Sequence, residues 1–264
     1  MGFSPWGYAR GVTDELRGRR ILVTGAATGI GAAAVSVLTD AGADVVATYH
    51  ATPPPPDLTA HWLQCDARDA DAVSALVHRA AEHLGGLDVL VHAAGLWQPG
   101  IPGCIGADDI SFLLDTNVKA TILTNQAAHA AMKAQDPKGG RIINFGSSEA
   151  VMGSPISAVY AATKGAVQAW TRSAAKAWAA DHVTVNALAP AVQTPGADRL
   201  RAFLGPDAAA LIDQQMQMMI PLGGALGEPV RDLGPMLVFL AGPGSGFITG
   251  QLLAVDGGLM MVGG

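Results

Sequence analysis

Short apolar runs rich in β-branched residues alternate along this chain with longer segments whose apolar residues recur at helical spacing. This alternation restricts the fold more than any other feature, because two neighbouring parallel strands must be joined by a long crossover. Such crossovers are right-handed and place helices on both faces of the sheet. We therefore predict an α/β fold, a doubly wound parallel sheet of about seven strands. The predicted strands are 20–24, 44–49, 61–65, 88–92, 141–145, 183–188 and 251–255, and the predicted helices are 29–41, 69–84, 107–134, 157–180 and 229–241.

The length and composition predict one domain preceded by a short extension. The chain has 264 residues, of which 50% are apolar, and no second regime of composition occurs along it. We expect an irregular N-terminal extension over residues 1–18 and a single domain over 19–264. The consecutive prolines at 53–56 favour an extended loop, and a plain spacer explains them better than recognition by a proline-binding partner.

Charge and cysteine content argue against several classes of function. A net charge of -6 without a basic run disfavours nucleic acid as a partner. No apolar stretch is long enough for a membrane span. Cys65 and Cys104 have no disulfide or metal spacing, and the seven histidines show no metal-ligand spacing either. We therefore predict a cytoplasmic protein with reduced thiols and no metal.

The segment TGAATGIG, residues 24–31, joins the first predicted strand to the first predicted helix. Glycines at 25, 29 and 31 permit a tight turn and the close approach of a pyrophosphate to the backbone. The positive N-terminus of the following helix would then face that phosphate. A tight turn without a ligand is the alternative, but the position in the first βαβ unit favours a dinucleotide site.

Tyr160 and Lys164 lie four residues apart in VYAATKG, so both side chains leave the same face of a helix. Free tyrosine has a pKa of about 10 and is a poor acid or base at neutral pH. Lowering the pKa of Tyr160 by about three pH units would need about 4 kcal/mol from nearby positive charge. Taken alone, the pair is better explained as two ordinary helix residues.

Several motifs in order resemble the short-chain dehydrogenase/reductase family, and the resemblance covers nearly the whole chain. TGAATGIG is similar to the TGxxxGxG turn of that family, and GSSEAVMGSPISAVYAATK resembles its serine segment followed by YxxxK. Asn117 in LLDTNVKA falls where the family keeps a helical asparagine. GEPVRDL and FITGQLLAVDGG resemble the C-terminal segments of the members that are 3-oxoacyl-acyl-carrier-protein reductases.

The resemblance implies a Rossmann-type fold and hydride transfer between a ketone or secondary alcohol and NAD or NADP. It implies Tyr160 as the general acid and base, Lys164 as its cationic neighbour and a ribose ligand, and Ser147 as a ligand of the substrate oxygen. It implies that Asn117 holds a water that passes protons to Lys164. Asp66 would contact the adenine, or would cap the next helix, or both. The implied cofactor-binding residues are Gly25, Thr28, Gly29, Ile30, Gly31, Tyr49, His50, Asp66, Ala67, Ala93, Ala94, Gly95, Tyr160, Lys164, Pro190, Ala191, Val192 and Thr194.

Some positions depart from the family pattern. HAAG replaces NNAG at 92–95, and His92 is better explained by packing at a strand end than by catalysis. The segment after Pro190 is one residue shorter than in the family. Thr194 is the candidate contact of the nicotinamide carboxamide, but the shorter segment leaves its alignment with the family open. Tyr49 stands where members that use NAD carry an acid. The absence of that acid favours NADP over NAD, although no Arg or Lys is close in the sequence to bind a 2′-phosphate.

Residues 195–227 lie where the family has its substrate lid. Met216, Met218 and Met219 would form either an apolar pocket wall or the core stripe of a helix, and the sequence does not separate the two. We predict a hydrophobic ketone or secondary alcohol as substrate, and an acyl-carrier-protein thioester is the alternative that the C-terminal segments imply. The opposite wall of the substrate site would consist of Trp97, Met152 and Ile156.

The alanine-rich helix 157–180 carries more small apolar surface than one sheet needs, and the family usually forms homotetramers through this helix, so we predict a homotetramer or homodimer.

Two rival functions remain. A sensor protein could hold the dinucleotide without turnover, but Tyr160 and Lys164 are both present. A dehydratase or epimerase on an extended version of the scaffold is disfavoured by the short chain.

Overall fold

The computed structural model describes residues 14–261, and within them it forms a seven-stranded sheet in the order β3-β2-β1-β4-β5-β6-β7. Every neighbouring pair of strands is parallel, which confirms the predicted doubly wound α/β fold. The direction of winding reverses between β1 and β4, and in open sheets of this type the crevice at such a reversal is the usual ligand site. The strands are β1 (Arg20–Thr24), β2 (Asp44–Tyr49), β3 (His61–Gln64), β4 (Val89–His92), β5 (Gly140–Phe145), β6 (Val183–Pro190) and β7 (Leu252–Val255).

Strand boundaries follow the predicted ranges closely, and the largest difference is at β6. This strand continues past its predicted end at 188 to Pro190. The extension has a partner, because Pro190 lies opposite Val255 in the parallel ladder with β7. The loop that carries Val192 and Thr194 therefore starts later than the sequence predicts.

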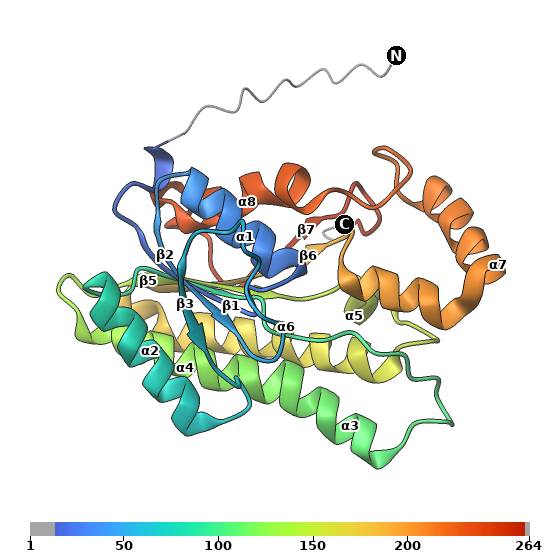
Figure 1. Cartoon of the computed structure of the whole chain (residues 1–264), viewed down its shortest axis with the longest axis horizontal. Coiled ribbons are helices and arrows are strands. Elements are labelled where there is room, and N and C mark those ends of the chain that lie inside the picture. Colours follow the sequence, from blue (N-terminus) through green and yellow to red (C-terminus); the bar gives the residue numbers. More distant parts are fainter. Residues whose placement is uncertain (1–13, 262–264) are drawn as a thin grey trace.

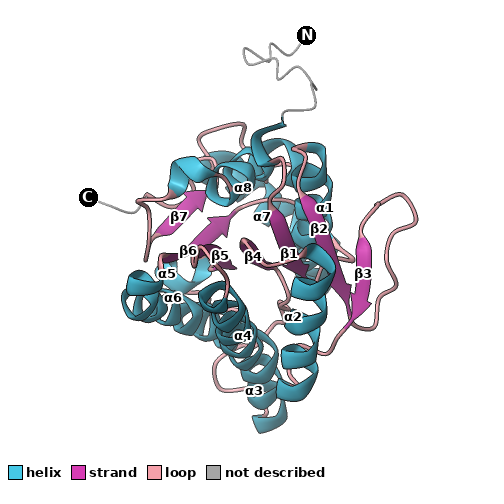
Figure 2. Ribbon diagram, turned by 90° about the vertical axis from the view of Figure 1, so that its left-hand side faces the viewer, coloured by secondary structure: helices cyan, strands magenta, loops and turns pink. Residues whose placement is uncertain are grey.

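Helices cover both faces of the sheet (Figure 2). One layer contains α1 and α8, and the other contains α2, α4 and α6. Each layer buries its own apolar cluster: Val35, Leu38 and Leu237 belong to the first, and Leu76 and Met132 to the second. The helices of these layers are α1 (Gly29–Asp40), α2 (Ala70–Leu84), α4 (Ala120–Ala134), α6 (Ala158–Trp178) and α8 (Gly234–Ala241).

The helix predicted over 107–134 is not uniform. It consists of α3 (Ala107–Leu113), a π-helical segment η2 (Leu114–Lys119) and α4. Asn117 lies in η2 and is fully buried. Single π-helical turns inside α-helices are rare, and those that occur are frequently found at functional sites. The π-helical segment at Asn117 therefore points to the site described below.

The described part of the N-terminal extension packs against the domain. Residues 1–13 of the predicted extension lie outside the described residues. Asp14–Leu16 forms a 3-10 helix, η1, and Leu16 is fully buried in the first core cluster. The N–H of Leu16 also donates to the carbonyl of Ala41 at 3.0 Å. Residues 50–60, with the four prolines, contain no helix or strand, as predicted.

The predicted lid segment begins with a long bent helix, α7 (Pro195–Met219). Its helical conformation is interrupted at Gly205, which has a φ of 76° and lies before Pro206. In Figure 1, α7 stands beside the end of the sheet where the short helix α5 (Glu149–Met152) lies. No helix within residues 14–261 is long and apolar enough to cross a membrane.

Candidate active site

The turn after β1 needs glycine for steric reasons. Gly25 and Gly29 have positive φ angles of 61° and 55°. A Cβ added to Gly31 would lie 2.2 Å from the carbonyl oxygen of Gly25, and a Cβ added to Gly25 would lie 2.6 Å from Cα of Ala94. The backbone at Gly25 and Gly31 is thus packed too closely for a side chain at either position.

The first turn of α1 is open to an anion. Thr28 is the N-cap residue of α1, but its side chain makes no capping hydrogen bond. The first N–H groups of a helix have no partner within the helix, and the helix dipole favours negative charge there. Backbone amides, a close-packed glycine turn and a helix N-terminus together fit a dinucleotide pyrophosphate.

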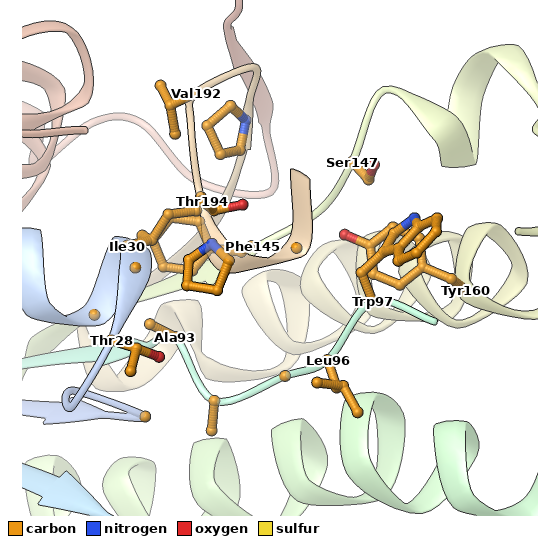
Figure 3. A pocket seen from close by; sticks show the side chains of 18 of the residues that line it. Thr28, Ile30, Ala93, Leu96, Trp97, Phe145, Ser147, Tyr160, Val192 and Thr194 are labelled. Carbon is orange, nitrogen blue, oxygen red and sulfur yellow. The ribbon is translucent and has the colours of Figure 1, made fainter. Parts of the chain in front are cut away.

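Two adjoining cavities run along the carboxyl ends of the strands. The first, of about 370 Å³, extends from the glycine turn to Ser147 and Tyr160. The second, of about 440 Å³, extends from the glycine turn to the ends of β2 and β3. Figure 3 shows Thr28 and Ile30 on one side of the first cavity and Ser147, Trp97 and Tyr160 on the other. The cavities are lined by the predicted cofactor residues Gly25, Thr28, Gly29, Ile30, Gly31, Tyr49, His50, Asp66, Ala67, Ala93, Ala94, Gly95, Tyr160, Lys164, Pro190, Val192 and Thr194.

Three of the four predicted catalytic residues line the first cavity. Tyr160 and Lys164 project from α6, and Nζ of Lys164 lies 5.8 Å from the centroid of the Tyr160 ring. Nζ also donates a hydrogen bond of 2.9 Å to the carbonyl of Phe145, at the end of β5. Ser147 follows β5, and its hydroxyl, which accepts a hydrogen bond of 3.2 Å from the N–H of Glu149, also favours the phenolate of Tyr160.

The protein groups raise the pKa of Tyr160, so Lys164 does not by itself produce the lowering that was expected from Lys164 together with the positive ring of the cofactor. Burial disfavours the phenolate most strongly, and the Glu149 carboxylate disfavours it further. The Ser147 hydroxyl and Arg199 act in the opposite direction but do not outweigh burial. Burial also lowers the pKa of Lys164 to about 8. The side chains of the site therefore favour a protonated phenol.

Glu149 connects the loop after β4 to the start of α6. Its carboxylate accepts a hydrogen bond of 3.2 Å from the indole N–H of Trp97 and another from the Ser157 hydroxyl. The hydroxyls of Ser154 and Ser157 are themselves 2.6 Å apart. No pattern in the sequence singles out this residue beyond its place in the serine segment.

Replacing Glu149 with Gln is expected to shift the pH dependence of alcohol oxidation to lower pH. In the alcohol oxidation that the family resemblance implies, the phenolate of Tyr160 would be the base, and the Glu149 charge raises the pKa of that group. Removing the charge lowers the pKa, so kcat/KM should reach its plateau at lower pH than in the wild type. Glu82→Gln, on the exposed face of α2, is the matched control and should leave the profile in place. A shift of the Glu149→Gln profile to higher pH would contradict this assignment.

Asn117 positions the loop that forms the floor of the cavity. Its Oδ1 accepts from the N–H of Leu96 at 2.8 Å, and its Nδ2 donates to the carbonyl of Leu96 and to the Thr163 hydroxyl. The Thr163 hydroxyl donates in turn to the carbonyl of Tyr160 at 2.7 Å. Both polar ends of the Asn117 side chain are thus engaged by protein groups, and the side chain itself does not line the cavity.

The second cavity contains a cation that the sequence analysis missed. Asp66 and Arg68 form a two-pronged ion pair, with 2.7 Å between Arg68 Nη2 and Asp66 Oδ2, and both line the cavity with Tyr49 and His50. Arg68 lowers the pKa of Asp66 to about 2. The expectation that no Arg or Lys lies near the end of β2 is wrong, because the parallel pairing of β2 with β3 brings the residues after β3 beside it. The cap of α2 is Asp69, not Asp66.

His92 is held in its neutral form at the end of β4. Burial lowers its pKa to about 3, and its Nδ1 lies 3.0 Å from the Thr24 hydroxyl. A neutral imidazole enclosed in this way cannot serve as an acid at neutral pH. Within residues 14–261, no group of three or more His, Cys, Asp or Glu side chains could hold a metal ion.

The substrate side differs from the expectation at several positions. Trp97 lines the first cavity. Met152, which is 52% exposed at the end of α5, and Ile156 line neither cavity. Ala191 is buried under the loop and does not line either cavity. Met218 on α7 is 77% exposed, so the methionines form neither a core stripe nor the wall of these cavities. The part of α7 that does reach the first cavity is its beginning: Pro195, Gly196 and Arg199.

Comparison with known proteins gives consistent matches over the whole domain. A family model described as enoyl-(acyl carrier protein) reductase matches residues 25–260. A 3-oxoacyl-[acyl-carrier-protein] reductase of Vibrio harveyi is 31% identical over 94% of this chain and 100% of its own. A cis-4-hydroxycyclohexanecarboxylate dehydrogenase of Sinomonas cyclohexanicum is 34% identical over 92% of this chain and 97% of its own. A crystal structure of a short-chain alcohol dehydrogenase from Sinorhizobium meliloti superposes with a TM-score of 0.81 at 32% identity, covering 93% and 98% of the two chains.

Proposed function

This chain belongs to the short-chain dehydrogenase/reductase family and is an NAD(P)-dependent oxidoreductase of ketones and alcohols, and we propose that Tyr160 is its general acid and base. The observation that carries the proposal is the meeting of Tyr160, Ser147 and Lys164 in the cavity that begins at the glycine turn. We further propose that residues 19–264 act as one cytoplasmic domain.

In the proposed reaction, the nicotinamide dinucleotide supplies or accepts the hydride. Ser147 donates a hydrogen bond to the substrate oxygen, and Tyr160 donates its phenolic proton to the same oxygen when a ketone is reduced. The partly buried, protonated phenol suits the role of acid in this direction. Lys164 supplies positive charge beside Tyr160 and a donor for the nicotinamide ribose, and Asn117 acts as a positioning residue for the loop at Leu96.

We propose NADP as the preferred cofactor. Tyr49 leaves the end of β2 without a carboxylate that would repel a 2′-phosphate. Arg68 and His50 line the same cavity, and a guanidinium binds phosphate oxygens with strong, charge-assisted hydrogen bonds. NAD remains the alternative cofactor, since Asp66 already occupies one edge of the Arg68 guanidinium.

Replacing Arg68 with Gln is expected to lower the ratio of kcat/KM for NADPH to kcat/KM for NADH by about 10- to 100-fold, the usual effect of losing a charged hydrogen bond. The substitution also removes the ion-pair partner of Asp66, which would affect the adenine end of NADPH and NADH equally. Because this effect is common to both cofactors, it cancels in the ratio. Arg79→Gln, on α2 and outside both cavities, is the matched control. An unchanged ratio in Arg68→Gln would mean that the guanidinium binds only Asp66 and does not bind the 2′-phosphate.

We propose a ketone or secondary alcohol with a hydrophobic carbon skeleton as substrate, because Leu96, Trp97 and Val192 line the first cavity. An acyl-carrier-protein thioester is the alternative, supported by the names of the family model and of the Vibrio relative. The test follows oxidation of NADPH or NADH at the absorbance of the reduced nicotinamide with a panel of ketones and one 3-oxoacyl thioester. Dinucleotide binding without turnover of any member would instead support the rival function, a non-catalytic sensor.

We propose that the protein assembles as a homotetramer through α6. Ala162 and Ala169 of this helix are exposed, and an apolar helix face of this kind favours a partner. Light scattering of the full chain should give a mass about four times that of the 26.9 kDa monomer. A monomer at micromolar concentration would contradict the assembly and leave the proposed chemistry untouched.

A further inference from the structure

The lining of the first cavity contains two charged side chains, Lys164 and Arg199, and both are cations. Lys164 is already engaged, because it is buried beside Tyr160 and donates to the carbonyl of Phe145. Arg199 has no role in the proposed reaction. A cation that lines a substrate cavity without an acidic lining residue favours an anionic group on the ligand.

Arg199 is an exposed residue that contacts the loop after β4. It lies one turn inside α7, whose N-cap Thr194 also lines the cavity. Its Nε donates a hydrogen bond of 3.2 Å to the main-chain carbonyl of Trp97. Figure 3 shows Trp97 on the same side of the cavity as Tyr160 and Ser147. The guanidinium is therefore anchored at the reacting end, not at the glycine turn.

Arg199 has no carboxylate partner within 4.0 Å among residues 14–261. The nearest acid of the site, Glu149, accepts hydrogen bonds from Trp97 and Ser157 and is absent from the cavity lining. Five other arginines do pair with an aspartate: Arg17, Arg20, Arg68, Arg201 and Arg231. Arg19, Arg79, Arg141 and Arg172 have no such partner among residues 14–261 either, but none of them lines the first cavity. The two Nη groups of Arg199 make no hydrogen bond to any described residue.

We propose that Arg199 binds a carboxylate of the substrate, so that the enzyme acts on keto acids and the matching hydroxy acids. This inference rests on the proposed function, because it assigns the substrate class of the same site. Arg199 holds the acid group at the start of α7 while Ser147 and Tyr160 hold the carbonyl oxygen. The apolar lining, Leu96 and Trp97, would contact the carbon skeleton between the two groups. A planar guanidinium with both Nη groups free matches the two oxygens of a carboxylate.

The dinucleotide diphosphate is the other anion that this cavity would receive. The open amides of α1 and the glycine turn suit that group, and they lie on the Thr28 side of the cavity. An arginine held by the carbonyl of Trp97 lies on the other side. The two assignments differ in a measurable way, because a diphosphate ligand would make Arg199 important for cofactor affinity with every substrate.

The test compares ketones that differ only in charge: 4-oxocyclohexanecarboxylate with its carboxamide, and 4-oxopentanoate with its carboxamide. The wild type should prefer the acid within at least one pair. Arg199→Met should lower the ratio of kcat/KM for that acid to kcat/KM for its amide by about 10- to 100-fold. Using the ratio removes any effect of Arg199 on the acidity of Tyr160, which both substrates share. Arg199→Lys should recover part of the ratio, because it restores the charge without the two-pronged geometry.

Arg201→Met is the matched control, since Arg201 lies on the same helix, pairs with Asp213 and does not line the cavity. Its acid-to-amide ratio should equal that of the wild type. A wild type that prefers the amide in both pairs, or that reduces only other neutral ketones, overturns the inference and leaves the proposed function standing. The inference is also overturned if Arg199→Met leaves the acid-to-amide ratio of kcat/KM unchanged, or if it raises the Kd for the dinucleotide about tenfold. No turnover of any ketone overturns the proposed function itself.

Discussion

Tyr160→Phe should reduce kcat by about 100- to 10,000-fold while the dissociation constant for the dinucleotide changes less than about threefold, because a positioned general acid typically contributes 10²- to 10⁴-fold. The variant removes one oxygen and keeps the ring that packs in the cavity beside Lys164. Without the phenolic proton, the oxygen of a reduced ketone has only Ser147 as a hydrogen-bond donor. The rate should be measured by absorbance of the reduced nicotinamide and the binding by quenching of tryptophan fluorescence.

The control for this variant is Tyr49→Phe. Tyr49 lines the second cavity at the end of β2, so loss of its hydroxyl should leave kcat close to the wild-type value. Thermal unfolding of both variants shows that the comparison is made between folded proteins. If Tyr160→Phe keeps more than a tenth of the wild-type kcat, the proton comes from another group and the proposed mechanism fails.

The fold was predictable because its signals are local. The apolar runs at 20–24 and 44–49 become β1 and β2 without a shift of boundary, since each is flanked by turn residues. Residues 114–119 show the limit of this approach. A π-helical turn inserts one extra residue per turn into an otherwise helical pattern, and the hydrophobic periodicity of a single sequence is too coarse to show it.

The site residues that lie in one sequence motif could be predicted. Those that only the fold brings together could not. Tyr160, Lys164 and Ser147 lie in one continuous segment, so their spacing alone brings them together. Arg68 and Arg199 reach the same cleft from the loop after β3 and from α7. Their relation to Tyr49 and Tyr160 depends on strand pairing and on the bend between β6 and α7, which no local pattern records.

The acidity of Tyr160 shows why a pairwise argument from sequence was insufficient. A lysine one turn away lowers the pKa only if the attraction of its charge outweighs the cost of removing the phenolate from water. Lys164 is buried and Tyr160 is partly buried, and removal from water penalises the charged form of each: it raises the pKa of Tyr160 and lowers that of Lys164 to about 8. Formation of the phenolate therefore needs positive charge beyond that of the chain, and a positively charged nicotinamide ring is suited to supply it.

Gly31→Ala should weaken dinucleotide binding by about 10- to 100-fold, since overpacking costs about 1–3 kcal/mol. The added Cβ would lie 2.2 Å from the carbonyl oxygen of Gly25 and 2.9 Å from Cα of Ala26. Both of these are backbone atoms, so no side-chain rotation relieves the overlap and the turn itself must move. The amides that face the pyrophosphate move with it. Titration of NADPH, followed by its fluorescence, measures the loss.

Gly165→Ala is the matched control because it makes the same change inside a helix, next to Lys164, where an added Cβ meets no atom within 4 Å. That variant should bind the dinucleotide as the wild type does and should be slightly more stable, by up to about 1 kcal/mol, since alanine favours the helix. Gly31→Ala should melt a few degrees lower, at about 2–4 °C per kcal/mol for a chain of this size. A folded Gly31→Ala protein with wild-type affinity would mean that the backbone of this turn does not hold the pyrophosphate.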